Sequence, residues 1–468
     1  MPKNRKQKSR KPHPVRLSSK QKPGNTKPNN GMVWPAPYPA NLAIPLAMQF
    51  KLQSSEWWSP QRLLVNQMSQ VNCLLRHAST TVPYYRAKFR DYQMVLDSTL
   101  TFDLFRQLPL LQRMDIQSAG TSLISKAIPA AHGAPFQVRS SGSTGRPIRV
   151  LGTAQTKMYV AALTMRGHLW HQRDGTQKNV DIRTAQTTAT HSRSAVWMAI
   201  PDGGKSITLD INRPIDKLLE QLIVEDPVYL QTHPYTLNGL IENSLARGLR
   251  PKSLREARTF GEALEPHIRV AARQHWGIEV VDNYSALETG PLAYQCPKSE
   301  NLHVQSESVL LEVLRDDGSP CQPGEVGRVV ITSLHNFATP LIRYELGDYA
   351  EVGDACSCGR GLPVLTRILG RQRNFLVLPT GEKRFPEAWR TFSDIAPEIR
   401  QFQLIQKSLE RIEINLVVTE SLSADKEQQL MHYLTDKFKH EFVYDFVYPD
   451  DIPRAANGKF EEFKSEVV

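Results

Sequence analysis

The feature that most limits the possible folds is the alternation of short β-branched runs with helical stretches between about residues 120 and 370. Short aliphatic runs bounded by turn residues are typical of strands. The clearest runs are Val228 to Leu230, Ile278 to Val281, Val309 to Leu314 and Val326 to Thr332. Between the last two, Asp316-Asp317-Gly318 supplies a turn and predicts a hairpin. The sequence therefore predicts an α/β fold with mixed sheets.

The N-terminal part of this body is predicted to be a helical cap. The chain has 468 residues, so we expect at least two domains. After a Pro-rich junction from Trp34 to Pro45, residues 57–92 carry apolar side chains at helical spacing. These side chains are Leu63, Leu64, Met68, Val71, Leu74 and Leu75. We expect the large domain to span residues 34–370.

A second, small α+β domain is predicted for residues 371–468. Strands are expected at Phe375 to Leu378, near Phe402 to Gln406, at Ile412 to Val418 and at Phe442 to Tyr448, and a polar tail ends the chain. A short helix should follow the first strand. A longer helix should begin at a Ser423 cap and bury Leu430, Leu434 and Phe438 on one face.

The basic charge of the chain is concentrated at its N-terminus. The formal net charge is +11, but residues 1–30 hold ten Lys or Arg and no Asp or Glu, which leaves +1 for the rest. We expect residues 1–33 to be a disordered, solvated tail, because they cannot bury enough apolar surface to offset their ordering entropy. Loose attraction to nucleic acid or anionic surfaces is the alternative for the tail. The nearly neutral body argues against specific nucleic-acid binding.

The segment from Ser140 to Pro147 has the composition of a phosphate-binding loop. Its residues are Ser140, Ser141, Gly142, Ser143, Thr144, Gly145, Arg146 and Pro147, and it lies between the strand-like FQV and IRVL. Consecutive amides and hydroxyls can surround phosphate oxygens, and glycines let the backbone approach a ligand. It is not a Walker loop, since no Gly-Lys-Ser/Thr is present. Alone, such a segment is more often a turn.

Two segments further along could form a nucleotide pocket with magnesium. Directly after the run IEVV comes Asp282-Asn283-Tyr284-Ser285-Ala286-Leu287-Glu288. An aromatic ring there can stack on a base, and Glu288 could hold a magnesium ion that bridges phosphates. About twenty residues upstream, Phe260-Gly261-Glu262-Ala263 could form the other wall of the pocket. The first segment is a weak signal by itself, and an ordinary loop before a helix is the alternative for the second.

Three later segments complete the set of ligand-binding candidates. In Pro340 to Asp348, the final Asp348 could accept both hydroxyls of a ribose. Gly370-Arg371-Gln372-Arg373-Asn374 falls at the predicted domain junction, where a hinge would lie. In Ile452 to Lys459, a Gly-preceded lysine could place its charge on a carboxylate and an α-phosphate. In isolation, Gly347-Asp348 would be a turn and Lys459 a solvated surface lysine.

The order and spacing of these segments resemble the adenylate-forming superfamily of acyl-CoA synthetases, peptide-synthetase adenylation domains and luciferases. Within it, the chain is most similar to phenylacetate-coenzyme A ligase and the related capsule-biosynthesis-type proteins. The residues that carry this resemblance are RLLVNQMSQVNCLLRHASTTVPYYR, GEVGRVVITSLHNFATPLIRYELGD and ILGRQRNFLVLPTGEKRFP. The similarity covers residues from about 57 to 468.

The resemblance implies a role for each matching position. Ser140 to Pro147 would be the phosphate loop, Gly261, Glu262, Ala263 and Tyr284 would line the adenine pocket with Asp282 beside them, and Glu288 would bind magnesium. Asp348 would anchor the ribose, Arg371 would meet the ribose and phosphate, and Lys459 would be the lysine of adenylation. The acid pocket would lie near Tyr284 and the His233-Pro234-Tyr235 segment, where His233 could touch the substrate, although a structural histidine is the favoured interpretation. The small domain would then rotate about the hinge and admit a thiol.

Several positions depart from the family pattern. Leu287 stands where a Ser or Thr usually precedes the glutamate, so a hydroxyl on the phosphate side is missing. Arg146 replaces a common lysine, which preserves the charge and changes the geometry. Arg373 and Asn374 replace a usual Asp at the hinge. The pattern therefore supports adenylation better than thioester formation.

Three of the five cysteines, with one histidine, could bind zinc. Five cysteines in so long a chain argue against a disulfide framework. Cys296, His303, Cys356 and Cys358 offer the ligand set of a closed structural zinc site. The Cys-x-Cys spacing is tighter than the usual Cys-x2-Cys. Unremarkable reduced cysteines are the alternative.

The whole pattern predicts an AMP-forming acid-thiol ligase. It would use magnesium-ATP to convert a small carboxylic acid to an acyl-adenylate and then pass the acyl group to coenzyme A. An amine or a carrier-protein thiol is the alternative acceptor, and a zinc-knuckle nucleic-acid-binding protein is the remote alternative function. No apolar run is long enough to span a membrane and no signal stretch is present, so we expect a cytoplasmic enzyme. A homodimer is left open.

Overall fold

The structure is a computed structural model that describes residues 40–90, 100–139, 147–184, 190–192, 204–386, 391–455 and 458–467. The predicted tail of residues 1–33 and the loop from Ser140 to Arg146 lie outside these described residues. Asn41–Val468 forms one unit. All contacts reported below lie within that unit.

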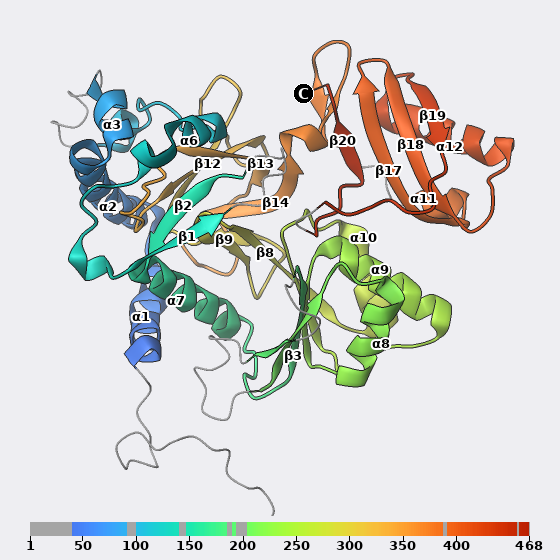
Figure 1. Cartoon of the computed structure of the whole chain (residues 1–468), viewed down its shortest axis with the longest axis horizontal. Helices are drawn as coiled ribbons and strands as arrows, with labels where there is room; N and C mark the ends of the chain where they lie inside the picture. Colours follow the sequence, from blue (N-terminus) through green and yellow to red (C-terminus); the bar gives the residue numbers. More distant parts are fainter. Residues whose placement is uncertain are drawn as a thin grey trace, which may run out of the picture. The chain divides into compact units, whose positions relative to one another are not determined.

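A mixed sheet of twelve strands dominates the part of the chain that the structure describes (Figure 1). Its strand order is β11-β12-β13-β14-β10-β9-β8-β7-β6-β3-β5-β4. The pairs β5/β3, β3/β6, β6/β7 and β7/β8 are parallel, whereas the pairs from β8 to β11 are antiparallel. The predicted α/β fold with mixed sheets is therefore confirmed. The bounds are β3 Asn179–Arg183, β4 Thr190–Ser192, β5 Ser206–Asp210, β6 Tyr229–Thr232, β7 Glu256–Phe260, β8 Glu279–Ala286, β9 Gly290–Gln295, β10 Leu302–Val304, β11 Val309–Leu314, β12 Val326–Ser333, β13 Tyr344–Val352 and β14 Val364–Arg371.

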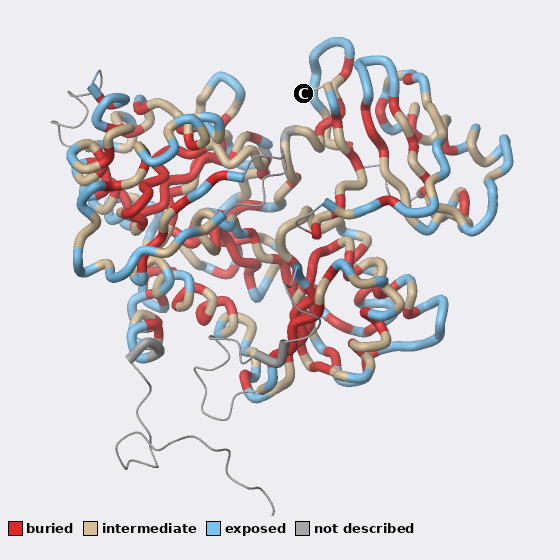
Figure 2. The backbone as a smooth tube through the Cα atoms, viewed as in Figure 1, coloured by how far each residue is buried: buried red, intermediate tan, exposed pale blue. Residues whose placement is uncertain are grey.

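The parallel strands are covered by amphipathic helices. Buried leucines of α8 and α9 pack with Val180, Leu230 and Ala257 of the strands in one apolar core. The strand interiors are buried on both faces, as is typical of parallel sheets (Figure 2). The helices and helical turns of this region are α7 Ala154–Trp170, α8 Ile215–Glu225, α9 Pro234–Arg247, α10 Pro266–Ala271 and the π-helical turn η5 Ala272–Trp276.

The antiparallel strands share a second core with the N-terminal helices. The predicted helical stretch of residues 57–92 is divided, because Pro83 follows the extended residue Val82 and starts a new helix. An additional helix covers part of the segment expected to be a Pro-rich junction, so that expectation is wrong for residues 40–45. The elements are α1 Ala40–Ser55, α2 Pro60–Thr81, α3 Pro83–Lys88, α5 Phe102–Phe105, α6 Arg113–Ala119, the 3-10 turns η2 Gly120–Leu123 and η3 Ala130–His132, and the hairpin strands β1 Pro135–Arg139 and β2 Arg149–Thr153.

The hairpin predicted around the Asp316 turn is confirmed. Val309 to Leu314 forms β11, which pairs antiparallel with β12, and Val309 lies opposite Ser333. Gly318 has φ +83, a backbone conformation that favours glycine. The local turn chemistry was therefore sufficient to predict this element.

The C-terminal part has its own four-stranded sheet and apolar core. The strand order is β19-β18-β17-β20, and α12 packs its predicted face of Leu430, Leu434 and Phe438 into that core. Ser423 is the N-cap, and its side chain accepts a hydrogen bond from the Lys426 N–H. The elements are the 3-10 turn η6 Gln372–Asn374, β15 Leu376–Val377, β16 Lys383–Arg384, α11 Thr391–Ile395, β17 Ile399–Ser408, β18 Arg411–Val418, α12 Ala424–Phe438, β19 Val443–Val447 and β20 Phe463–Ser465.

The chain end differs from the expected polar tail. β20 pairs parallel with β17, where Leu404 is opposite Phe463. Phe463 is buried in the C-terminal core. Among the described helices, none combines the length and apolar character needed to cross a membrane.

Candidate active site

Several of the separately predicted segments meet at one cavity of about 160 Å³. The cavity lies beside the carboxyl ends of β7 and β8, the place where α/β sheets usually bind ligands. Its lining comes from the loop after β7, from β8, from β13 and β14, and from the C-terminal part. Predicted site residues in the lining are Tyr235, Gly261, Glu262, Ala263, Asp282, Tyr284, Asp348, Arg371 and Lys459.

One wall of the cavity is a hydrogen-bonded group around Asp348. The Tyr284 hydroxyl donates to Asp348 Oδ2 at 2.8 Å, and Arg371 Nε lies 3.4 Å from Asp348 Oδ1. Strands β13 and β14 place Asp348 directly opposite Arg371. Burial, followed by the Asp348 charge, raises the pKa of Tyr284 well above its usual value. Tyr284 therefore remains a protonated donor, and Asp348 remains available as an acceptor for a ligand hydroxyl.

Lys459 reaches the cavity from the C-terminal loop. Its Cε lies 3.5 Å from the position that a Cβ would take at Gly261. The preceding residue, Gly458, has φ +78, and a Cβ there would come within 2.7 Å of Ile211 Cγ2, so only glycine fits. Burial and the Arg371 charge lower the pKa of Lys459, while Asp348 and other carboxylates oppose that shift. The lysine is therefore a poorly solvated cation next to the predicted nucleotide pocket.

The Glu262 side chain bonds to protein groups. Its Oε2 accepts from the Tyr235 N–H at 3.1 Å, and its Oε1 accepts from the Phe460 N–H at 2.8 Å. His233 Nδ1 is 3.3 Å from Oε1. The Tyr235 ring stacks on Phe460 with a centroid distance of 3.9 Å. His233 and Tyr235, predicted near the acid pocket, thus both border Glu262.

The two other predicted carboxylates differ in their surroundings. Asp282 Oδ1 accepts from the Thr259 hydroxyl at 2.7 Å, and burial raises the pKa of Asp282. Glu288 follows β8 and does not belong to the described lining of the cavity. Burial raises the pKa of Glu288, although the charges of Arg113 and Arg371 oppose that effect. Glu288 is thus electrostatically coupled to the cavity through Arg371.

The predicted phosphate loop cannot be placed, since Ser140 to Arg146 lie outside the described residues. Its flanks are described. Strands β1 and β2 pair antiparallel with Arg139 opposite Arg149, so the loop connects the two ends of a hairpin. This agrees with the strand-loop-strand order expected from the sequence.

Two hinge residues contact the loop that carries Lys459. Arg373 Nε donates to Glu461 Oε1 at 3.0 Å. Asn374 Oδ1 accepts from the Arg371 N–H at 2.9 Å, and its Nδ2 donates to the Phe463 carbonyl at 2.8 Å. Sequence reasoning missed these contacts. Their partners lie 88 and 89 positions away, and no local pattern signals such a pairing.

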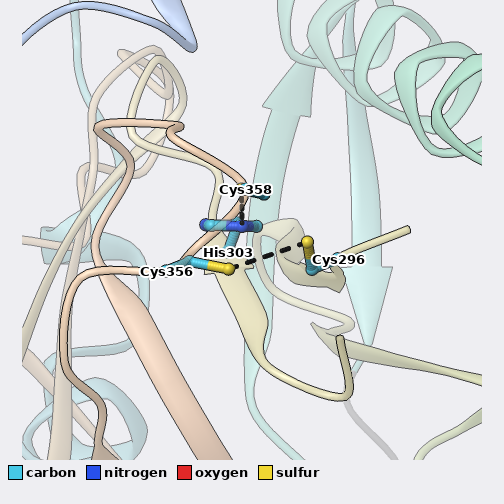
Figure 3. A group of neighbouring side chains, drawn as sticks. All are labelled: Cys296, His303, Cys356 and Cys358. Carbon is cyan, nitrogen blue, oxygen red and sulfur yellow. Dashed lines mark hydrogen bonds between the residues drawn. The ribbon is translucent and has the colours of Figure 1, made fainter. Parts of the chain in front are cut away.

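A second cluster is formed by the four predicted zinc ligands (Figure 3). The ligand atoms of Cys296, His303, Cys356 and Cys358 all lie within 4.8 Å of one another, and all four residues are buried. Cys356 Sγ is 3.8 Å from Cys296 Sγ, and Cys358 Sγ is 3.3 Å from His303 Nε2. The 52 residues between His303 and Cys356 in the sequence thus do not keep the four ligand atoms apart in space. Loop folding brings the Cys-x-Cys segment beside the end of β9 and beside β10.

The geometry of this cluster fits a tetrahedral metal ion. Bond lengths of ~2.3 Å for Zn–S and ~2.0 Å for Zn–N place neighbouring ligand atoms roughly 3.5 to 3.8 Å apart. The main-chain N–H groups of Lys298 and Arg360 each donate to the sulfur two positions earlier, Cys296 and Cys358, at 3.4 Å. Such N–H donors suit thiolate sulfur, the form that binds zinc. A residue pattern with odd spacing in the sequence is therefore compact in the structure.

Comparisons with known proteins agree with this architecture. Residues 388–466 match the family model of the CapK C-terminal domain. Phenylacetate-coenzyme A ligase of Thermus thermophilus is 23% identical over 391 residues, which cover 79% of this chain and 85% of that protein. The Escherichia coli enzyme of the same name is 24% identical over 404 residues, which cover 83% and 91%.

The solved structures of 2-hydroxyisobutyryl-CoA ligase share the fold. In the postadenylation state with 2-HIB-AMP, the TM-score is 0.71 at 15% identity, with 88% of this chain and 91% of the other covered. In the thioesterification state with CoA, the TM-score is 0.60 at 16% identity, with 88% and 92% covered. Both likenesses concern the fold alone.

The large mixed sheet and the separate C-terminal domain form the fold of the solved acyl-CoA ligase structures, and the sequence similarity to phenylacetate-coenzyme A ligases agrees with an AMP-forming ligase. The chain is similar to the phenylacetate-coenzyme A ligases over most of its length, and its C-terminal part is similar to the CapK C-terminal domain. The family resemblance expected from the sequence is thereby confirmed.

Proposed function

We propose that this protein uses ATP to convert a carboxylic acid to an acyl-adenylate, with release of pyrophosphate, and then transfers the acyl group to the thiol of coenzyme A. The observation that carries the proposal is the position of Lys459 in one cavity with Tyr284, Asp348 and Arg371. These residues are far apart in the sequence, and only the tertiary fold brings them to the same cavity. A cation and a ribose acceptor around one cavity suit an adenylate.

Each residue has a proposed role in the first half-reaction. Tyr284 and the backbone from Gly261 to Ala263 would hold the adenine, and Asp348 would accept the ribose hydroxyls. Lys459 would neutralise charge between the carboxylate and the α-phosphate as pyrophosphate leaves. Arg371 lies beside Asp348 Oδ1, whereas Tyr284 bonds to Oδ2, and Arg371 would orient the ribose and phosphate. Catalysis would thus rest on positioning and charge neutralisation.

The residues proposed to bind the phosphates are the loop from Ser140 to Pro147 and, through magnesium, Glu288. Magnesium prefers carboxylate oxygens and substrate phosphates, and it would supply further charge neutralisation. A deprotonated Glu288 is needed for that role. Because burial raises its pKa and Arg371 opposes the shift, Glu288 is expected to gain its full negative charge beside a cation.

The test of this function is exchange of labelled pyrophosphate into ATP. Arylacetic acids come first in the screen because the relatives are named phenylacetate-coenzyme A ligases, followed by aryl, fatty, amino and short hydroxy acids. We expect acid-dependent exchange that falls by a factor on the order of 10² to 10³ in Lys459→Ala. The assignment fails if no acid supports exchange or if Lys459→Ala exchanges like the wild type.

The acceptor is tested with the acid found in that screen. Formation of a thioester with coenzyme A is compared with formation of an amide and with acylation of a carrier-protein thiol, the two alternatives that the sequence leaves open.

We propose a cytoplasmic location, because ATP and coenzyme A are used there and the five cysteines are free. A homodimer is tested by light scattering.

We also propose that Cys296, His303, Cys356 and Cys358 hold a structural zinc ion. All four ligand positions are filled by protein side chains, as in closed structural sites, so the ion would stabilise the fold. Metal-stripped protein refilled with zinc is expected to bind one ion per chain, and Cys356→Ser is expected to lose it. Cys73→Ser is the control, since this cysteine is exposed and outside the cluster. Wild-type protein that holds no zinc after refilling contradicts the proposal.

A further inference from the structure

Glu262 has a side chain that is almost fully buried, at 8% exposed, although it borders the cavity. Burying a carboxylate is costly unless hydrogen bonds compensate. Its two oxygens find such bonds with main-chain groups on different parts of the chain. Oε2 accepts from the Tyr235 N–H and Oε1 from the Phe460 N–H. Glu262 therefore joins α9 to the C-terminal loop.

The α9 contact fixes Glu262 on the large domain. His233 is the N-cap of α9 and Pro234 is its first residue, so the Tyr235 N–H is one of the amides that a helix leaves unpaired. An anion at this end is also favoured by the helix dipole. Glu262 is thus held in place whether or not the C-terminal loop is nearby.

The C-terminal loop is held against the same helix end by a ring contact. The Tyr235 ring stacks on the Phe460 ring with an interplanar angle of 24°, and the Arg454 guanidinium lies 5.1 Å from the centre of the Tyr235 ring. The Phe460 N–H is therefore bound by Glu262, and the Phe460 ring is bound by Tyr235 at the start of α9. Because successive Cα atoms are only about 3.8 Å apart, this also restricts Lys459.

We propose that Glu262 is a positioning residue for adenylation: by binding the Phe460 N–H, it keeps Lys459 in the cavity. The inference rests on the proposed function and goes beyond the adenine-pocket role that the sequence suggested for this segment. Glu262 acts through Phe460 and does not need to touch the substrate. It should therefore matter in the half-reaction that uses Lys459 and not in the transfer of the acyl group to the thiol.

Two variants and one matched control separate this role from a general effect on folding. Glu262→Ala removes both hydrogen bonds, and Glu262→Gln retains one acceptor oxygen. Glu279→Gln makes the same change on an exposed glutamate at the start of β8 that bonds to Arg273 and does not line the cavity. We expect pyrophosphate exchange to fall roughly ten- to hundredfold in Glu262→Ala, less in Glu262→Gln and not in the control, since the lost bond is to a charged acceptor. Thioester formation from supplied acyl-adenylate should stay within about twofold of the wild type.

A second readout needs no substrate. Acetylation of lysines by an amine-selective reagent, followed by peptide mass spectrometry, reports how often Lys459 leaves the cavity. Glu262→Ala should raise the Lys459 rate by about tenfold, in proportion to the lost restraint, while the exposed Lys383 gives an unchanged internal reference.

The outcomes distinguish the inference from the function. Wild-type protein that exchanges with no acid contradicts the proposed function, but the acetylation result still decides the inference. If Lys459 reacts equally in wild type and Glu262→Ala, Glu262 does not position it. Equal losses in exchange and thioester formation would also overturn the proposal, because they indicate a role in binding the nucleotide or in folding.

Discussion

Lys459 shows how a single residue acquires its chemistry from its place in the fold. An exposed lysine near a chain end would be a fully hydrated cation. Here burial and the neighbouring Arg371 lower its pKa, although the charges of Asp348 and Glu262 oppose that shift. A weakly hydrated ammonium interacts more strongly with phosphate oxygens than a hydrated one does. The same environment makes its charge sensitive to alkaline pH.

The first prediction is therefore a pH dependence. Lysine acts here only when protonated, and its pKa lies below the usual 10.5, so activity should fall on the alkaline side before an ordinary lysine loses its proton. We expect a plot of kcat/KM for ATP against pH, measured with the exchange assay, to show this fall as a descending alkaline limb. Lys459→Arg should move the limb to higher pH, even at a lower rate, because guanidinium stays protonated.

The control for this prediction is Lys437→Arg, a change at an exposed lysine of α12 that does not line the cavity. It should leave the alkaline limb where it is. A limb that stays in place in Lys459→Arg would show that another group titrates.

At the same scale, the sequence predicts identities better than partners. Tyr284, Asp348, Arg371 and Lys459 were recognised from their motifs, and all four line the cavity. The side-chain contacts of Glu262 were not predictable. Its acceptor oxygens bind main-chain N–H groups 27 and 198 positions away. Every residue except proline has such a group, so the residue type does not indicate which one is the donor. Residue type therefore indicates what a group can do, whereas its partner depends on the tertiary fold.

Among the elements, α7 is joined to the turn between β10 and β11 by a buried arginine. The Arg166 side chain is 2% exposed and binds both carboxylate oxygens of Glu307, at 2.9 and 2.6 Å. It also donates to the Leu52 carbonyl of α1. Burial alone would raise the pKa of Glu307, but Arg166 outweighs that effect and lowers it. This contribution to stability is present above the unfolded pKa of Glu307 and is lost as the pH falls through its folded pKa.

The second prediction follows from this buried pair. Arg166→Met leaves Glu307 without its charged partner and should cost about 3 to 5 kcal/mol in the free energy of unfolding, measured with urea. Adding Glu307→Gln should recover part of the loss, because the orphaned charge is then gone. Arg411→Met is the control, since the Arg411–Asp445 pair is exposed and should contribute little. Equal effects of Arg166→Met and Arg411→Met would contradict this account.

Elements defined by local chemistry were predictable, and those defined by tertiary pairing were not. The β11–β12 hairpin and the Ser423 cap follow from nearby residues. Helix α1 was missed because it contains Pro45, yet Gln49 of that helix donates to the Ala162 carbonyl of α7 and Leu52 is buried. Strand β20 spans three residues and exists only because β17 pairs with it. Tertiary contacts overrode weak local propensity in both cases.

For the whole molecule, the predicted site depends on segments that are distant in the sequence. Lys459 meets residues from the loop after β7 and from β8, β13 and β14 in one cavity, while the parallel part of the sheet and the C-terminal sheet keep separate cores. The family order of motifs predicted that these segments meet, but the spacing of residues alone could not.

The basic charge of the molecule is concentrated at one end of the chain, since ten of the 58 Lys and Arg residues lie in the first 30 positions.

The third prediction concerns this charge. Because the rest of the chain carries only +1, removal of residues 1–30 should leave pyrophosphate exchange and the thermal midpoint of unfolding nearly unchanged. The same deletion should abolish salt-sensitive retention on heparin or DNA, since that attraction scales with the number of cations that meet phosphates or sulfates. Replacing the ten Lys and Arg of the segment by Gln keeps the length and should give the same two results. A loss of exchange in either variant would place the tail in the enzymatic reaction, and retention that persists without it would locate an anion-binding surface on the body of the protein.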